Sequence, residues 1–264
     1  MFEEMRPRFV LGLMTVTAIV SISLLLQATG NVLLTNIVML LVFYTVPPVW
    51  ICSYYFKKHG IKLRQTLFVH GIARWLLPIA GLTLVMMAFS FSVYWLMMRG
   101  LLSISPVSVQ IALTSQPLPG EMWYLAATGF IIAVIAPIAE EFVFRGVIMH
   151  RLMATFGLWK GVGLTSLIFS LFHINILSAF LFAIVASLLY LKTGTLLAPI
   201  LLHIFNNTLS VYQYSFNPSF PEWLIVTSVD DLYTKSGPNL VTLIVSSVLL
   251  LFFITWLFRS LEKR

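Results

Sequence analysis

The sequence predicts an all-α, polytopic membrane protein. Of its 264 residues, 59% are hydrophobic and only 9% are charged, whereas roughly a quarter of the residues are charged in a typical soluble domain. Apolar runs recur along the chain, and most approach the length of about 20 residues that a helix needs to cross the hydrocarbon core. We therefore expect a single integral membrane domain over residues 1–264, with about eight transmembrane helices.

The eight expected spans are separated by short polar segments. In chain order they are Phe9–Ala28, Asn31–Phe56, Leu76–Met98, Trp123–Glu140, Leu158–Ile174, Leu177–Leu191, Leu196–Tyr212 and Leu240–Phe258. The fifth, sixth and seventh are short, which is tolerated where a helix is buried in protein or lines a cavity. The basic segment Lys57–Trp75 is expected at the membrane surface. The segment Arg99–Met122, which is interrupted by prolines, is expected to be a loop.

The distribution of basic residues predicts the orientation. Cytoplasmic loops of membrane proteins carry an excess of Lys and Arg. With eight spans and a cytoplasmic N-terminus, all of the 16 Lys and Arg residues except Arg99 and Lys235 fall on the cytoplasmic side. Both termini are then cytoplasmic. The net charge of +7 is spread over short connecting segments and does not form one basic face, so it predicts contact with the lipid bilayer and not with nucleic acid.

The fourth span carries ionisable residues where charge is expensive. Glu140, Glu141 and Arg145 lie in the stretch P-I-A-E-E-F-V-F-R, and an ionisable residue at membrane depth is a functional-site hypothesis by default. On a helix, Glu141 and Arg145 are four residues apart and can form an ion pair across one turn. Glu140 is left without that partner, so it is the first candidate for the reactive group.

Two further polar pairs follow on the next helices. Phe169 and His173 are four residues apart, and so are His203 and Asn207. A single histidine in an apolar helix is more often a packing residue than a functional one. Three polar placements on successive helices favour one shared pocket, because a shared pocket desolvates these groups once and lets them hydrogen-bond one another.

These residue types allow two kinds of hydrolytic site. In the first, a glutamate accepts a proton from water, a histidine orients that water, and the Asn207 amide with a histidine N–H stabilises the oxyanion. In the second, a zinc ion holds the water, with Glu140, His173 and His203 as its ligands. We favour the first, without a cofactor, because enlisting Glu140 as a ligand would remove it as a free base.

The three motifs together resemble a known family. Glu-Glu-x-x-x-Arg, Phe-x-x-x-His and His-x-x-x-Asn, in this order within residues 124–210, are similar to the motifs of the CAAX-protease and bacteriocin-processing family, also called Abi or Rce1-like. The resemblance implies a catalytic core over 124–210, an intramembrane endopeptidase activity and a cavity open to the cytoplasmic leaflet. It also implies that Glu140 and His173 activate water, and that His203 and Asn207 stabilise the oxyanion. Glu141, Arg145 and Phe169 are then supporting residues.

The resemblance also suggests a biological setting. It implies a peptide or membrane-protein substrate, and the short chain is more similar to bacterial members of the family, which are linked to bacteriocin self-immunity and peptide processing. We therefore expect the protein in a bacterial plasma membrane. Two readings from other classes stay open here: a transporter or channel that uses the Glu and His residues as a relay, and a non-catalytic immunity or scaffold protein.

Overall fold

The computed structural model confirms an all-α membrane protein. It describes residues 32–58, 71–113, 121–216 and 219–262, together with residues 12, 16, 60, 62 and 67. Within these ranges every regular element is helical. Four helices there are long and apolar enough to cross a membrane: Ala73–Leu102, Met122–Phe156, Ile176–Thr193 and Ser236–Arg259. The expected span Phe9–Ala28, apart from residues 12 and 16, and about half of Lys57–Trp75 lie outside the described residues, and the count of eight spans stays a prediction.

Several of the helical segments follow one another without a break, and stretches of π-helix (η) alternate with α-helix. The elements are α2 (Val32–Trp50), η1 (Ile51–Phe56), α4 (Ala73–Leu102), α5 (Pro106–Leu113), α6 (Met122–Phe130), η2 (Ile131–Ile135), α7 (Ala136–Glu141), η3 (Phe142–Ile148), α8 (Met149–Phe156), α9 (Leu158–Ser170), α10 (Ile176–Thr193), α11 (Leu197–Phe216), α12 (Asp231–Thr234) and α13 (Ser236–Glu262).

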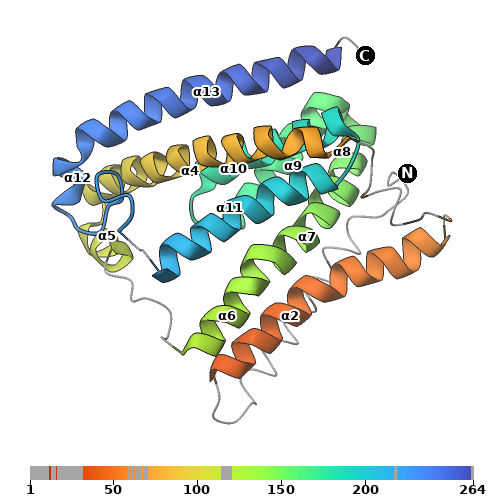
Figure 1. Cartoon of the computed structure of the whole chain (residues 1–264), viewed down its shortest axis with the longest axis horizontal. Coiled ribbons are helices and arrows are strands. Elements are labelled where there is room, and N and C mark those ends of the chain that lie inside the picture. Colours follow the sequence, from red (N-terminus) through yellow and green to blue (C-terminus); the bar gives the residue numbers. More distant parts are fainter. Residues whose placement is uncertain are drawn as a thin grey trace.

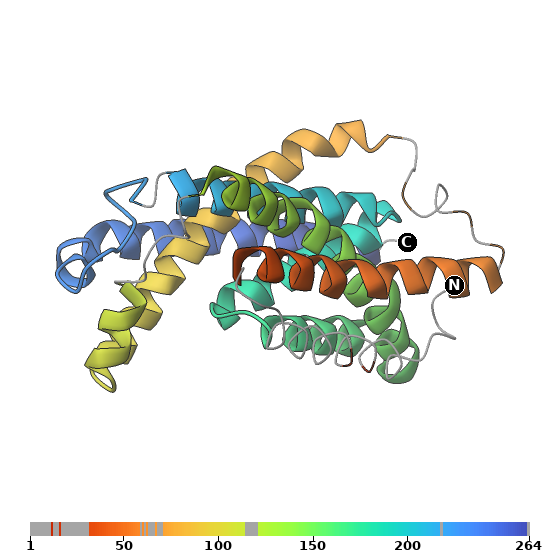
Figure 2. The same cartoon turned by 90° about the horizontal axis from the view of Figure 1, so that it is seen from below.

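The helices pack in layers around a core that runs along α10 and α11. In Figure 1, α13 lies along one edge of the molecule beside α4, and α9, α10 and α11 lie beneath α4. The helix from α6 to α8 crosses this group diagonally, and α2 packs along its outer side, as Figure 2 also shows. The largest cluster of buried apolar side chains joins α4, η3, α10 and α11. Small residues such as Ala183 and Ala186 on α10 let its neighbours approach closely.

The fourth expected span is longer than predicted. The helix continues beyond Glu140 and forms one apolar unit of 35 residues, Met122–Phe156, so the acidic pair lies near its middle and not near its end. Arg145, expected in a cytoplasmic segment, is fully buried inside this helix. The predicted span ended at the first charged residues, because charges facing lipid are costly. In the structure Glu141 and Arg145 form an ion pair inside the protein, and the helix continues past them.

Two other segments differ from the expectation. α9 has only 13 residues, about 20 Å at 1.5 Å per residue, so the helix ends four residues before the expected end of the fifth span, Leu158–Ile174. The turn between α9 and α10 is pinned to α4, because the Asn175 side chain donates to the Ser90 carbonyl at 3.0 Å. The expected loop Arg99–Met122 contains α5, which begins at Pro106, a residue well suited to the first position of a helix.

A tight corner joins α8 to α9 and fixes where the hairpin of α9 and α10 begins. Gly157 has a φ of +84° there, which only glycine adopts without strain. Gly161 packs directly on the α8 backbone, since a Cβ atom at this position would lie 2.5 Å from the Met153 nitrogen. The corner therefore depends on the absence of a side chain at residue 161.

We predict that Gly161→Ala lowers stability by about 1–3 kcal/mol, the usual effect of forcing extra atoms into a packed contact. The matched control is Gly163→Ala on the same helix, where a Cβ would meet nothing within 4 Å. That substitution should be neutral or slightly stabilising, because alanine is the better helix former. Thermal unfolding of both variants in detergent checks this. Equal behaviour of the two variants would contradict the packing argument.

Candidate active site

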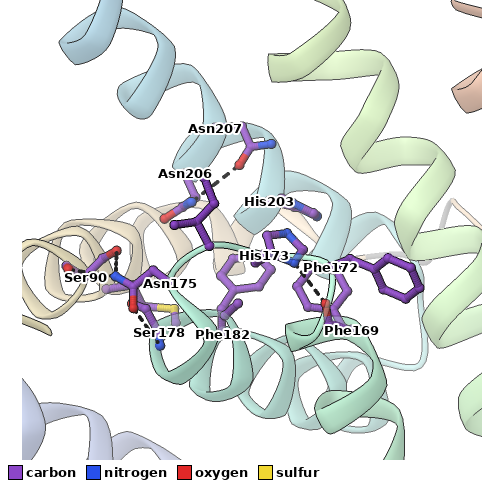
Figure 3. A pocket seen from close by; sticks show the side chains of 13 residues that line it. Ser90, Phe169, Phe172, His173, Asn175, Ser178, Phe182, His203, Asn206 and Asn207 are labelled. Atoms are coloured by element: carbon purple, nitrogen blue, oxygen red, sulfur yellow. Dashed lines mark hydrogen bonds between the residues drawn. The ribbon is translucent and has the colours of Figure 1, made fainter. Parts of the chain in front are cut away.

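The structure brings together all seven residues that the sequence singled out. Glu140 and Glu141 end α7, Arg145 lies in η3, Phe169 and His173 lie at the end of α9 and in the turn after it, and His203 and Asn207 lie on α11. In Figure 3 the two histidine side chains lie close to each other, with Asn207 above them on α11 and Phe169 below.

The centre of the site is a buried ion pair. Arg145 Nη1 donates to Glu141 Oε1 at 2.7 Å, and both side chains are fully buried. Arg145 Nη2 also donates to the Ala183 carbonyl of α10 at 3.3 Å, and the guanidinium lies over the Phe169 ring, 4.7 Å from its centre. The pair that the spacing predicts is therefore present, and it connects η3 to α9 and α10.

His203 extends this ion pair into a chain. Its Nδ1 lies 2.9 Å from Glu141 Oε1, the same oxygen that accepts from Arg145. A carboxylate that is paired with an arginine can only accept hydrogen bonds, so the proton at this contact must be on Nδ1. The neutral ring then carries its lone pair on Nε2. That atom lies 3.9 Å from Glu140 Oε2, so Glu141 orients the histidine toward Glu140.

His173 is held by a different partner. Its Nδ1 lies 2.9 Å from the carbonyl of Phe169, which again requires the proton on Nδ1 and leaves Nε2 as the acceptor. The imidazole stacks on the Phe169 ring with centres 4.4 Å apart. The predicted pairing of Phe169 and His173 is present, but α9 ends at Ser170, so His173 reaches it from the turn and not from a helix face.

Asn207 is anchored by a carbonyl that a proline leaves free. Its Nδ2 donates to the carbonyl of Ile132 at 2.9 Å. In the π-helical segment η2, the Ala136 N–H bonds to the Ile131 carbonyl, five residues back. The corresponding partner of the Ile132 carbonyl would be residue 137, which is a proline without an N–H. Pro137 thus leaves the Ile132 carbonyl free to accept from Asn207. The second N–H of the Asn207 side-chain amide does not bond to Ile132.

A cavity of about 380 Å³ opens beside these groups (Figure 3). It is lined by His173, His203 and Asn207, and by further polar side chains that the sequence had not indicated: Ser90, Asn175, Ser178 and Asn206. Asn206 lies one residue from the motif and one turn from His203, so the periodicity of α11 could have suggested it. Ser90 carried no signal in the sequence, because α4 is far from the motifs in the chain.

Glu140 lies at the edge of this arrangement. Its side chain is 16% exposed, and its Oε2 atom has no hydrogen-bond partner among the described residues. Glu141, by contrast, is fully buried and held by Arg145 and His203. Each acid has one oxygen, Oε2, without a hydrogen-bond partner among the described residues. The two acids differ in their other contacts: Glu141 is fixed through Oε1 by Arg145 and His203, whereas Glu140 is partly exposed and its Oε2 lies 3.9 Å from His203 Nε2.

The zinc alternative would need three side chains around one ion. Within the part of the chain that the structure describes, no three His, Cys, Asp or Glu side chains converge as ligands of one metal ion. Of the two histidines, only His203 lies within 4 Å of Glu140, although the bonds at Nδ1 leave Nε2 free in both rings. We therefore derive no step through a metal.

Fold and site together define an α-helical integral membrane protein with a buried cluster of glutamate, histidine and asparagine. Residues 122–209 match the family model of the Rce1-like type II CAAX prenyl endopeptidases. This match confirms the resemblance seen in the motifs, and the family that it matches is one of endopeptidases.

One relative gives the comparison at the level of the sequence. The chain is 28% identical over 179 residues to an "Uncharacterized 24.3 kDa protein" of Escherichia coli, and the match covers 60% of this chain and 80% of that protein. No solved structure matches the chain.

We predict that Arg145→Met lowers the free energy of unfolding by about 3–5 kcal/mol, because it leaves the Glu141 carboxylate buried without its cation. The double variant Glu141→Gln/Arg145→Met removes both charges and should recover a large part of this loss. Lys160→Met, at an exposed lysine on α9, serves as the control and should stay within about 0.5 kcal/mol of the wild type. A double variant no more stable than Arg145→Met would argue against a paired, buried charge.

Proposed function

We propose that the protein is an intramembrane endopeptidase that hydrolyses a peptide bond near the membrane with a water molecule activated by Glu140. The observation that supports this most directly is the contrast between the two acids. Glu141 is fully buried and fixed through Oε1 by Arg145 and His203, whereas Glu140 is 16% exposed and its unbonded Oε2 lies 3.9 Å from His203 Nε2. A general base needs such a free, well-placed acceptor.

In this proposal the water lies between Glu140 and the histidines. A distance of 3.9 Å is too long for a direct hydrogen bond, but an oxygen atom that bridges the two groups can bond to both. Glu140 takes the proton from the water as it attacks the carbonyl carbon. Glu141 holds His203 in one tautomer, and it stabilises the imidazolium if His203 accepts a proton during the reaction.

The oxyanion is stabilised from α11 by Asn207, and not by His203 as expected, because the N–H of the neutral His203 ring is bonded to Glu141. The Asn207 amide is fixed through Ile132 and retains a second N–H for the oxygen that gains negative charge. Donors that are already in place require no reorganisation during the reaction, which is why they lower the barrier efficiently. His173 lines the same cavity, and its Nε2 lone pair is the alternative acceptor for the hydrogen of the water that Glu140 does not take.

The cavity suits an uncharged segment of a peptide. Its lining combines the amides of Asn175, Asn206 and Asn207 with apolar side chains such as Phe172 and Ile174. Amide groups can donate to and accept from a peptide main chain, and the apolar side chains suit hydrophobic residues of the substrate. This supports a peptide or membrane-protein substrate that reaches the site within or beside the bilayer. Bacteriocin self-immunity and peptide processing are both biological roles that such a cleavage can serve.

The distribution of charge supports cytoplasmic termini. Basic residues lie at the end of the bundle where α2 and α13 finish and where α10 connects to α11, among them Lys57, Lys192 and Arg259. Arg99 and Lys235 lie at the opposite end, near α5 and α12 (Figure 1). By the positive-inside rule the first end is cytoplasmic. The relative in Escherichia coli supports a bacterial plasma membrane as the location.

We predict that Glu140→Gln abolishes cleavage, with a loss of at least 10²–10⁴-fold in rate, the usual contribution of a general base. Purified protein in detergent is incubated with a peptide library, and the products are identified by mass spectrometry. The glutamine is close in size to the glutamate, so the variant should accumulate and unfold like the wild type. Glu222→Gln, in an exposed loop at the opposite end of the bundle, is the control and should cleave normally.

Two outcomes would contradict this assignment. The first is near-normal cleavage by Glu140→Gln combined with a folded but inactive Glu141→Gln. The second is wild-type activity that disappears in a chelator and returns stoichiometrically with added zinc. A wild-type protein that cleaves no peptide of the library, while a purified partner binds to it through the same cavity, would favour the non-catalytic reading.

A further inference from the structure

Among the four long apolar helices that the structure describes, α13 is the most exposed. Only 17% of its apolar stretch is buried inside the protein, against 39% to 50% for the other three. Its outer face carries an apolar stripe formed by Val245, Val248 and Phe252, each of which is more than half exposed. These positions are three and four residues apart, so they lie on one side of the helix. In a membrane this α13 stripe is in contact with lipid tails.

The α13 stripe leads to a cluster of aromatic side chains near the end of the helix. Trp256 follows Phe252 by four residues and is 45% exposed. Its ring lies 5.6 Å from the ring of Phe253 and 6.1 Å from the ring of Trp75, at the start of α4. Tryptophan is enriched where a helix passes from the hydrocarbon core to the lipid headgroups. The Trp256 cluster, formed by Trp75, Phe253 and Trp256, therefore marks the headgroup level.

Basic residues from three helices lie at the level of this cluster. Lys192 is in the last turn of α10, and its Nζ atom lies 5.9 Å from the centre of the Trp256 ring. Arg259 is exposed one turn after Trp256, on the same side of α13. Arg74 is exposed directly before Trp75 in α4. Among the described side chains, none of these three cations has a carboxylate as its ion-pair partner.

We propose that this end of α13 is a binding site for an anionic phospholipid. Lys192, Arg259 and Arg74 hold the phosphate, and an acyl chain lies along the α13 stripe, with Trp256 between the two parts. A headgroup with net negative charge is favoured, because a zwitterionic lipid such as phosphatidylcholine also brings a cation to the basic residues. In the orientation proposed above, the lipid belongs to the cytoplasmic leaflet. The site does not use the catalytic cavity and does not rest on the proposed catalytic function.

The charges favour a lipid over a second copy of the chain on the α13 stripe. In a twofold dimer formed through this face, the same end of both α13 helices would meet. Arg259 and Lys192 of each copy would then face like charges at the same depth, and like charges repel. A lipid phosphate neutralises the same groups and leaves the stripe covered by its acyl chain.

The first test measures lipid binding directly. Delipidated protein in detergent is titrated with dioleoyl phosphatidylglycerol or dioleoyl phosphatidylcholine, and bound lipid is counted by native mass spectrometry. We expect tighter binding of phosphatidylglycerol. Lys192→Gln and Arg259→Gln should each weaken its binding about fivefold, the usual contribution of one cation near an anionic membrane surface, and should leave phosphatidylcholine binding unchanged.

The matched control is Lys57→Gln. This exposed lysine follows η1 at the same end of the bundle, and η1 continues α2, which lies far from α13 (Figure 1). The substitution removes the same charge, so it separates a specific site from a general effect of net charge. Lys57→Gln should bind phosphatidylglycerol like the wild type.

The second test follows thermal unfolding of the same variants. A ligand that binds only the folded state raises the melting temperature by mass action. Phosphatidylglycerol should stabilise the wild type and Lys57→Gln more than phosphatidylcholine does. In the double variant Lys192→Gln/Arg259→Gln the two lipids should stabilise equally, while the melting temperature without lipid stays close to that of the wild type.

Three results would overturn the proposal. The first is equal binding of the two lipids by the wild type. The second is a loss of phosphatidylglycerol binding in Lys57→Gln as large as that in Lys192→Gln and Arg259→Gln, which would show a general effect of charge. The third is a dimer of the lipid-free protein that persists when phosphatidylglycerol is added and dissociates in Phe252→Ala, which would assign the stripe to a second copy. No peptide substrate enters either test, so the proposed catalytic function stands or fails separately.

Discussion

The site depends on one buried ion pair, Glu141 with Arg145. Two charges that are withdrawn from water are stabilising only when they are paired and further hydrogen-bonded, and here the arginine also bonds to Ala183 and lies over Phe169. The pair gives α10 and α9 fixed positions relative to η3, and it provides the carboxylate that orients His203. With Glu141 occupied in this way, the neighbouring acid, Glu140, remains available for chemistry.

The central helix departs from regular α geometry on both sides of the acidic pair. η2 precedes α7 and η3 follows it, and short π segments within α-helices are frequently found at functional sites. A π segment turns the residues that follow it and leaves some carbonyl groups without a helical partner. Pro137 ensures that the Ile132 carbonyl is one of these, and Asn207 uses it. The π-helical segment η2 therefore determines where the Asn207 side-chain amide lies.

The sequence predicted what depends on local spacing and missed what depends on tertiary contacts. The all-α membrane fold follows from composition, and the bond between Glu141 and Arg145 follows from their separation by four residues. The contact between His203 and Glu141 joins residues 62 positions apart, and that between Asn207 and the Ile132 carbonyl joins residues 75 positions apart. The length of the central helix was missed because a charge buried in protein does not end a helix in the way that a charge facing lipid does.

The central claim is that Glu141 fixes the tautomer and direction of His203. Nitrogen NMR of protein labelled with ¹⁵N-histidine tests it directly, because protonated and unprotonated ring nitrogens have distinct shifts, and His203→Gln assigns the signal. The account predicts that His203 is protonated at Nδ1 in the wild type, and that Glu141→Leu, which removes the acceptor, abolishes this preference while Lys160→Met preserves it. A neutral His203 with its proton on Nε2 in the wild type would contradict the account.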